Sequence, residues 1–197
     1  MTHLGPALRR MRRLRGMKQS HVAELAGVTQ ATVSRWEAGS HRPDPEQALR
    51  LTAFLQARLD GVAERALKRL VETSALPVHL ICDVTHRLFA ASAGREREWT
   101  RGADTFIGDT VWPYACDEIR EAEARLPDIG WYDPAAVPVA SWHGANGHPV
   151  MRILPGLMVW ERMVLADGTA VRLCTTVEPD RLDALYPDRR LLRASPC

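Results

Sequence analysis

The sequence lacks the features that mark several large classes of protein. No apolar run approaches the roughly 18 residues that cross a membrane, and the N-terminus has no apolar core like that of a signal peptide. The motifs HExxH and GxSxG and a phosphate-binding loop are absent, and the acidic residues and histidines of the second half follow no catalytic spacing. We therefore expect a cytoplasmic protein that has no membrane partner and is not an enzyme.

Cysteine is also scarce, and its spacing argues against the common cysteine-based sites. The 4 cysteines lie far apart without a CxxC pair, so we predict reduced thiols with no metal and no cofactor. They are Cys82, Cys116, Cys174 and Cys197. A zinc or haem site is an alternative, although His79 and Cys82 would point to opposite faces of a strand. Its candidate donors are His79, Cys82, His86, His143 and His148.

Charge is distributed unevenly along the chain. Residues 1–74 contain 13 Lys and Arg against 7 Asp and Glu, whereas residues 75–197 contain 13 against 17. A basic first part and an acidic remainder suit a first domain that meets a polyanion and a second domain that stays away from it. With 197 residues, of which 46% are hydrophobic, the chain can form two small globular domains.

The N-terminal part predicts short helices, because apolar positions recur at three and four and single turn residues interrupt them. The first helix places Leu4, Leu8 and Met11 on one face and ends at Gly16. The arginine cluster Arg9–Arg15 on its other faces could contact DNA or be an inert solvated face. A second helix is expected over Gln19–Ala26, ended by Gly27. Its inward residues are predicted to be Val22, Leu25 and Ala26.

The next two helices are predicted from their capping residues. Thr29 can cap the third helix, and Gly39 follows its last residue where a left-handed conformation is favoured. The pattern Asp44, Pro45 and Gln47 predicts the start of the fourth.

An apolar stripe continues beyond this point, so a further helix is expected to run to Glu72 despite Gly61. The stripe consists of Leu51, Leu55, Leu59, Val62, Ala66 and Leu70. It could be the seam of a homodimer or pack onto either domain.

The segment from Gln19 to Gly39 resembles the helix-turn-helix of the Cro/C1-type family, which includes phage repressors. The resemblance covers residues 4–56 and matches the small, turn, core and terminal positions of that family. These are Ala23, Gly27, Val33, Trp36, Glu37, Gly39 and Pro43. A small Ala23 lets the two helices cross closely, and Gly27 lets the chain turn between them.

The resemblance implies which residues meet double-stranded DNA. Val33 and Trp36 face the core, so the base-reading side chains on the third helix would be Gln30, Ala31, Ser34 and Arg35. The phosphate contacts would come from Lys18, Gln19, Thr29, Thr32 and Arg42. Arg12 and Glu37 match a family salt bridge and are expected to be structural. Lys18 departs from the family, since many relatives have a small capping residue there.

The second half changes from helical to strand periodicity. Two strands are expected over 78–83 and 87–91, and a hairpin is expected from 158 to 177 around Ala166-Asp167-Gly168. A helix is predicted over Asp117–Arg125 and a loop over 127–149. This order resembles a PAS-like domain, an antiparallel sheet with helices on one face, over residues 78–178.

The PAS-like resemblance implies either a sensor with a small-molecule ligand or a rigid dimerisation platform. Four tryptophans could line a ligand pocket or form the core. They are Trp112, Trp131, Trp142 and Trp160.

The sequence therefore predicts an α+β protein with four segments. They are a helix-turn-helix domain of about five helices at 1–58, a helical connector at 59–76, a PAS-like domain at 77–180 and a tail at 181–197. The predicted function is a transcriptional regulator that binds palindromic operator DNA as a homodimer and is modulated through its C-terminal domain. An antitoxin or phage-type repressor controlled by a protein partner, and a DNA-tethered enzyme, are the alternatives.

Overall fold

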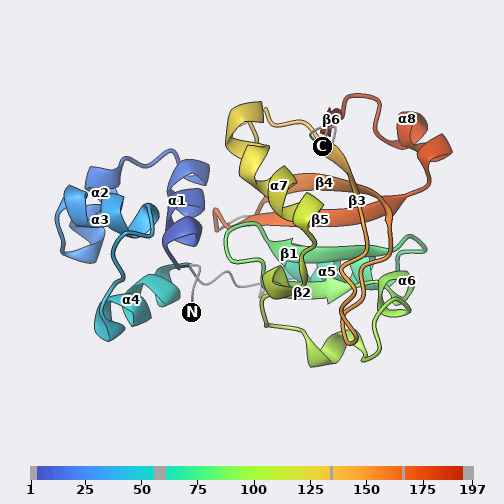
Figure 1. Ribbon diagram of the computed structural model, residues 1–197, viewed down its shortest axis with the longest axis horizontal. Coiled ribbons are helices and arrows are strands. Elements are labelled where there is room, and N and C mark those ends of the chain that lie inside the picture. Colours follow the sequence, from blue (N-terminus) through green and yellow to red (C-terminus); the bar gives the residue numbers. More distant parts are fainter. Residues whose placement is uncertain (1–3, 56–60, 134, 166, 193–197) are drawn as a thin grey trace.

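The computed structural model describes residues 4–55, 61–133, 135–165 and 167–192. A group of short helices lies beside a sheet that is flanked by further helices (Figure 1). The first group comprises α1 (Leu4–Leu14), α2 (Gln19–Ala26), α3 (Gln30–Glu37) and α4 (Pro45–Leu55). Helix α1 lies nearest to the sheet, and α2 and α3 lie on the far side of α1 (Figure 1).

The core of the helical group contains most of the residues that the sequence pattern selects. Leu8, Met11, Val22, Val33 and Trp36 are all at most 3% exposed. The prediction for α2 was wrong at one position, because Leu25 is 58% exposed. This helix of 8 residues buries only Val22 and Ala23, two consecutive residues on the face toward the core. Leu25 lies at the edge of that face.

The predicted helix ends are confirmed. The hydroxyl of Thr29 accepts a bond from the amide of Thr32 at 3.2 Å, and Gly39 has a φ of +73°. At the start of α4 the amide of Gln47 donates to the carboxylate of Asp44 at 2.8 Å, and the amide of Asp44 donates to the side-chain oxygen of Gln47 at 3.0 Å. These bonds satisfy amides that have no partner inside the helix.

The apolar stripe does not form one continuous face. Leu51 and Leu55 are buried in the helical group, whereas Leu59 lies outside the described residues. Helix α5 (Val62–Glu72) starts separately after its N-cap Gly61, and its Val62 and Leu70 are 77% and 69% exposed. The apolar residues continue at spacings of three and four in the sequence, but those of α4 pack in the helical group and α5 packs on the sheet.

The sheet has the strand order β2-β1-β5-β4-β3-β6. All pairs are antiparallel except β3 with β6. The strands are β1 (Val78–Cys82), β2 (Leu88–Ala91), β3 (Val139–His143), β4 (Gly156–Val164), β5 (Ala170–Val177) and β6 (Arg190–Leu192). Both predicted hairpins are present. The β4–β5 turn contains Gly168 with a φ of +80°, and Ala166 lies outside the described residues.

Two strands were missed by the sequence analysis. Strand β3 lies inside the segment 127–149 that was predicted as loop, and β6 lies inside the predicted tail. Both are short and are flanked by Gly- or Pro-containing segments, so local pattern does not distinguish them from loop. Their order comes from pairing with distant strands, β3 with β4 and β6 with β3.

Helices cover both faces of the sheet. On one face Ile81, Trp160 and Cys174 pack with the residues of α7 (Asp117–Arg125) and the loops around it. On the other face Val78 and Leu80 pack with α5, which the sequence analysis had assigned to a connector. The shorter helices are α6 (Ala93–Glu96), η1 (Ala103–Thr105), η2 (Trp112–Tyr114), η3 (Leu126–Ile129), η4 (Pro179–Arg181) and α8 (Leu182–Leu185). The α+β class is confirmed.

The described helices include none that is both long and apolar enough to cross a membrane.

Candidate nucleic-acid interface and cavity beside the sheet

The crossing of α2 and α3 depends on two small residues. Gly27 adopts a φ of +65°, which strains any side chain with a Cβ atom, and its amide closes the end of α2. Ala23 is 4% exposed, and its carbonyl accepts the amide of Val28 at 2.9 Å. The chain therefore reverses between the two helices within three residues.

Helix α3 has a buried face and an exposed face. Val33 and Trp36 are at most 1% exposed and hold the helix against the core. Gln30, Ala31 and Arg35 are exposed, and Ser34 is half-buried. The four residues that the sequence proposes as base readers therefore lie away from the core, where a groove of DNA could reach them.

A chain of polar contacts connects this exposed face to the core. Arg12 donates to both carboxylate oxygens of Glu37, at 2.7 and 2.9 Å, so the expected ion pair between α1 and α3 is present. Gln19 donates to Glu37 at 2.9 Å, and Gln30 donates to Gln19 at 2.6 Å. Burial raises the pKa of Glu37, but the bonds from Arg12 and Gln19 outweigh it and lower the pKa overall. The ionised pair orients both glutamines.

The proposed phosphate contacts lie near the ends of α2 and α3. Lys18, Thr29 and Arg42 are exposed, whereas Gln19 and Thr32 are half-buried. Lys18 is the N-cap of α2 and makes no capping bond with its side chain. The first-turn amides of α2 therefore have no side-chain cap there, and the helix dipole favours an anion at this end.

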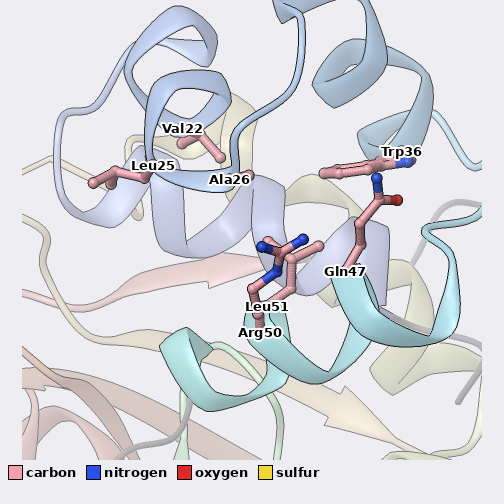
Figure 2. A pocket seen from close by; sticks show the side chains of 7 residues that line it. All are labelled: Val22, Leu25, Ala26, Trp36, Gln47, Arg50 and Leu51. Atoms are coloured by element: carbon pink, nitrogen blue, oxygen red, sulfur yellow. The ribbon is translucent and has the colours of Figure 1, made fainter.

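A shallow groove lies on the helical group between α2 and α4. Figure 2 shows Val22, Leu25 and Ala26 of α2 on one side and Gln47, Arg50 and Leu51 of α4 on the other, with Trp36 at one end. The groove explains why Leu25 is exposed although its position on α2 fits an apolar stripe.

The arginines of the cluster Arg9–Arg15 have different surroundings, and Arg12 belongs to the ion pair with Glu37 described above. Arg10 donates to the carbonyl of Val84 in the sheet domain, and the guanidinium of Arg13 lies 5.7 Å from the centre of the Tyr132 ring. Arg9 and Arg15 are exposed. Part of the cluster therefore contacts the second domain, an outcome that neither sequence interpretation had included.

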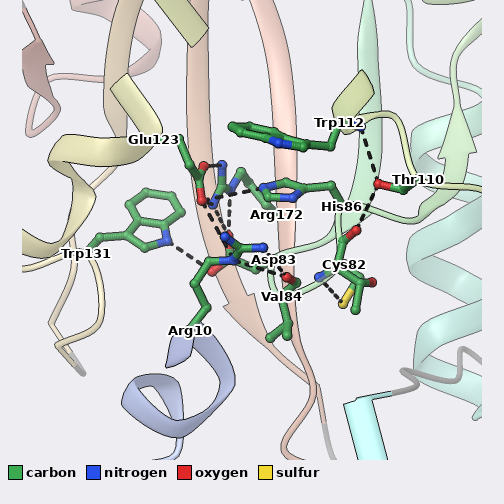
Figure 3. Close-up of polar contacts among 11 residues, drawn as sticks. Arg10, Cys82, Asp83, Val84, His86, Thr110, Trp112, Glu123, Trp131 and Arg172 are labelled. Atoms are coloured by element: carbon green, nitrogen blue, oxygen red, sulfur yellow. Dashed lines mark hydrogen bonds and ion pairs between the residues drawn. The ribbon is translucent and has the colours of Figure 1, made fainter. Parts of the chain in front are cut away.

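A buried ionic network lies where Arg10 meets the sheet domain (Figure 3). Arg172 is 2% exposed and pairs with Asp83 and with Glu123, the latter at 2.6 Å. Trp131 donates to Asp83 at 3.0 Å, and Arg10 lies 3.9 Å from Glu123. Burial raises the pKa of Glu123, but the neighbouring positive charge of Arg172 outweighs it, so the pKa lies far below its usual range.

This network was not predicted from the sequence. One signal was available, because Arg172 stands in a strand between Val171 and Leu173, among residues that are otherwise mostly apolar. A charge at such a position requires a buried partner.

A cavity of about 70 Å³ lies between the sheet and α7. Trp112 and Trp160 line it, as do His86, Glu123 and Arg172 (Figure 3 shows all of these except Trp160). The other two tryptophans proposed for a pocket are elsewhere, because Trp131 is 1% exposed in the core and Trp142 is 51% exposed. The tryptophans are thus neither all pocket nor all core.

The candidate metal donors are not brought together. Cys82 packs in the core shared with the helical group, whereas His79 and His86 line the cavity. Throughout the described ranges, no group of three or more His, Cys, Asp or Glu residues could hold a metal ion. Cys82, Cys116 and Cys174 are buried free thiols, and Cys197 lies outside these ranges.

Comparison with known proteins agrees with the geometry of the first domain. Residues 8–62 match the family model for a helix-turn-helix. No curated protein sequence is similar enough to count as a match. One similar solved structure is a sensory box sensor histidine kinase from Vibrio cholerae, with 12% identity and a TM-score of 0.39, covering 58% of this chain and 90% of that chain.

The N-terminal domain is a Cro/C1-type helix-turn-helix domain. The C-terminal domain has the order of elements expected of a PAS-like domain, with an opening hairpin, a helical middle and three strands that end in a hairpin. Strand β6 is an addition to that order.

Proposed function

We propose that this protein is a transcriptional regulator that reads operator DNA with α3. The observation that carries the proposal is the pairing of a buried face, Val33 and Trp36, with an exposed face that includes Gln30 and Arg35. An α-helix held in this way fits the major groove of DNA. No step of catalysis is part of the function.

The exposed side chains of α3 suit the edges of bases. A glutamine can make a paired contact to adenine, an arginine to guanine, and the methyl group of Ala31 can contact the methyl group of thymine. Gln30 and Gln19 are already bonded to each other, so both amides are oriented before DNA arrives. Base reading is assigned to Gln30, Ala31, Ser34 and Arg35.

Backbone phosphates would be held by residues around this helix. Lys18 and Arg42 supply positive charge, and Gln19, Thr29 and Thr32 supply hydrogen-bond donors. Such contacts provide affinity that depends on salt but not on base sequence.

We also propose that the protein binds DNA as a homodimer. One helix-turn-helix buries too little surface for tight specific binding, and paired copies read half-sites about 34 Å apart. The apolar residues exposed on α5, Val62 and Leu70, support a seam on that helix, since a symmetric pair would bury them.

The C-terminal domain is proposed to modulate DNA binding. Glu123 lines the cavity and also lies 3.9 Å from Arg10, which belongs to the DNA-binding domain. An occupant of the cavity that displaces Glu123 would therefore alter a contact between the domains. In this proposal residues 1–58 bind DNA, residues 59–76 connect the two domains, and residues 77–180 modulate the binding.

Selection of bound sequences from random DNA by the full-length protein tests the base-reading role. We expect a palindromic site. Arg35→Ala should weaken binding to that site by about 1–3 kcal/mol and leave binding to random DNA nearly unchanged. Equal losses on both kinds of DNA would contradict base reading by Arg35, and failure to enrich any sequence would contradict the proposal as a whole.

The phosphate contacts have a separate signature. Lys18→Ala or Arg42→Ala should weaken binding to all DNA and reduce the slope of log affinity against log salt by about one unit. Arg101→Ala is the matched control, because Arg101 is an exposed arginine outside both the helix-turn-helix and α5. A slope that stays the same in both test variants would remove these residues from the interface.

A further inference from the structure

The lining of the cavity is mainly apolar and comes from several elements. Ile81 lies on β1, Ile119 on α7, and Met158 and Trp160 on β4. Trp112 stacks on His86 with ring centres 4.6 Å apart. Such a surface favours an apolar occupant, with selectivity left to the few polar groups.

The buried charges at the cavity already have partners. Arg172 pairs with Asp83 and Glu123. Arg95 is 3% exposed and donates to Glu98 at 2.7 Å, and also to Thr176 and to the carbonyl of Pro77. An ionic ligand would lose its hydration on entering the cavity and would find no buried charge there that is free to pair with it. The lining therefore disfavours charged occupants.

One charged residue of the lining, Arg152, is not buried. Arg152 is exposed and donates to the carbonyl of Glu98 at 3.2 Å. Water already solvates its charge, so an anion would gain little from contact with it.

Three residues of the lining, His79, His86 and Arg95, each have a buried nitrogen atom without a hydrogen-bond partner among the described residues. His86 and Arg95 still have carboxylates as neighbours, Glu123 at 3.5 Å and Glu98 at 2.7 Å, whereas His79 has no such neighbour in an ion pair within the described ranges. Its ring lies edge-on to Trp99, 6.5 Å between centres, and borders the cavity. Its buried Nδ1 has no hydrogen-bond partner in the part of the chain that the structure describes. Burial, together with the positive charges of Arg95 and Arg172, lowers the pKa of His79 well below its ordinary value. The ring is therefore neutral at pH 7 and can donate or accept one bond.

The size of the cavity restricts the occupant further. A cavity of about 150 Å³ admits benzene, and this one is about 70 Å³. A molecule of about five non-hydrogen atoms is the size that suits such a space. Even the most efficient ligands of that size bind no more tightly than the micromolar range.

We propose that the cavity binds an uncharged short-chain molecule whose single hydroxyl or carbonyl group pairs with Nδ1 of His79. The chemical class is a short aliphatic alcohol, ketone or aldehyde. The inference rests on the proposed function only for its effect on DNA, because binding to the cavity can be measured without DNA.

Calorimetric titration of the full-length protein with four probes of similar size tests the charge and polarity of the site. The probes are 1-butanol, 1-chlorobutane, butyrate and butylammonium. We expect 1-butanol to bind at least about tenfold more tightly than either ion, because the ions lose hydration without a buried counter-charge. Binding of either ion as tight as that of 1-butanol would overturn the proposal, as would no binding of 1-butanol at its solubility limit.

The role of His79 is tested by His79→Phe, which keeps a ring at the position. The variant should lose about tenfold in affinity for 1-butanol and little for 1-chlorobutane. His21→Phe is the matched control, because His21 is exposed on α2. An unchanged ratio of the two affinities in His79→Phe would refute the assignment of Nδ1.

A second variant is independent of His79. Ala115 also lines the cavity, and Ala115→Leu should fill part of it and weaken 1-butanol and 1-chlorobutane alike. Unchanged binding of 1-butanol in this variant would place the ligand elsewhere. If 1-butanol binds as expected but the protein selects no DNA sequence, the proposed function fails and the ligand class stands.

Discussion

The guanidinium of Arg10 in α1 donates two hydrogen bonds to the main-chain carbonyl of Val84, from Nε at 3.0 Å and from Nη2 at 2.6 Å (Figure 3). Val84 lies in the turn between β1 and β2, and its side chain packs in the same buried cluster as Leu8 of α1. The same turn carries His86, whose φ of +57° is unusual for a residue with a side chain. One turn thus meets the DNA-binding domain through Val84 and the cavity through His86.

Replacing Arg10 by alanine should loosen the contact between the two domains. The change removes the two hydrogen bonds that the charged Arg10 donates to the carbonyl of Val84. The free energy that holds the domains together should fall by about 2 kcal/mol. Nuclear magnetic relaxation should then show the domains tumbling more independently than in the original protein. Arg9→Ala is the control, because Arg9 is exposed on the same helix. Similar tumbling in both variants would contradict a coupling role for Arg10.

Glu37→Gln should destabilise the helix-turn-helix domain by about 3 kcal/mol, because it leaves the charge of Arg12 without its buried partner. Denaturant unfolding measures the effect. Glu46→Gln breaks an ion pair with Arg50 in which both side chains are more than half exposed, and it should cost less than about 0.5 kcal/mol. Equal costs for the two variants would show that burial of the Arg12–Glu37 pair is unimportant.

Gly5→Ala should also destabilise this domain. A Cβ atom at Gly5 would lie 1.9 Å from the carbonyl oxygen of Trp36, so α1 and α3 would have to separate. The expected loss is about 1–3 kcal/mol, despite the better helix propensity of alanine. At Gly102 a Cβ atom would meet nothing within 4 Å, so Gly102→Ala is the control for thermal unfolding. A melting temperature that falls equally in both variants would exclude close packing as the cause.

Stability should decrease as the pH falls from 6.5 to 5. Burial lowers the pKa of His79 and that of His86 below the ordinary value, so the unfolded chain binds protons in this range that the folded chain does not. Each histidine should contribute a slope of up to about 1.4 kcal/mol per pH unit, with full stability above pH 6.5. His79→Phe should reduce the slope in urea unfolding, and the exposed His21→Phe should not. A free energy of unfolding that rises as the pH falls from 6.5 to 5 would contradict lowered pKa values for these two histidines.

The helical half was largely predictable because its signals are local. Thr29, Gly39 and the pair Asp44 and Gln47 act on amides within a few residues of themselves, and each has the predicted role. Leu25 was misplaced for the opposite reason. Whether an apolar residue at the edge of a helix is covered depends on how closely α4 approaches, which spacing along α2 does not contain.

The cavity beside the sheet was less predictable than the helices, because it is built from residues far apart in the chain. His79 and His86 were singled out from the sequence only as candidate metal donors. The ion pairs beside them, Asp83 with Arg172 and Glu123 with Arg10, join residues that no local sequence pattern connects. Strand β3 was also hard to predict, because its 5 residues form a strand by pairing with β4 and not through a strong strand propensity of their own.

Local sequence was enough to predict the helix-turn-helix, the exposed face of α3 and the two hairpins of the sheet. These features depend on periodicity, capping and turn chemistry, which act over a few residues. Three features could be seen only in the folded protein. Arg10 contacts the second domain, α5 covers one face of the sheet, and Arg172 pairs with both carboxylates beside the cavity. Each of these depends on which distant segments meet, and the free energy of such contacts comes from burial and charge pairing that no local pattern encodes.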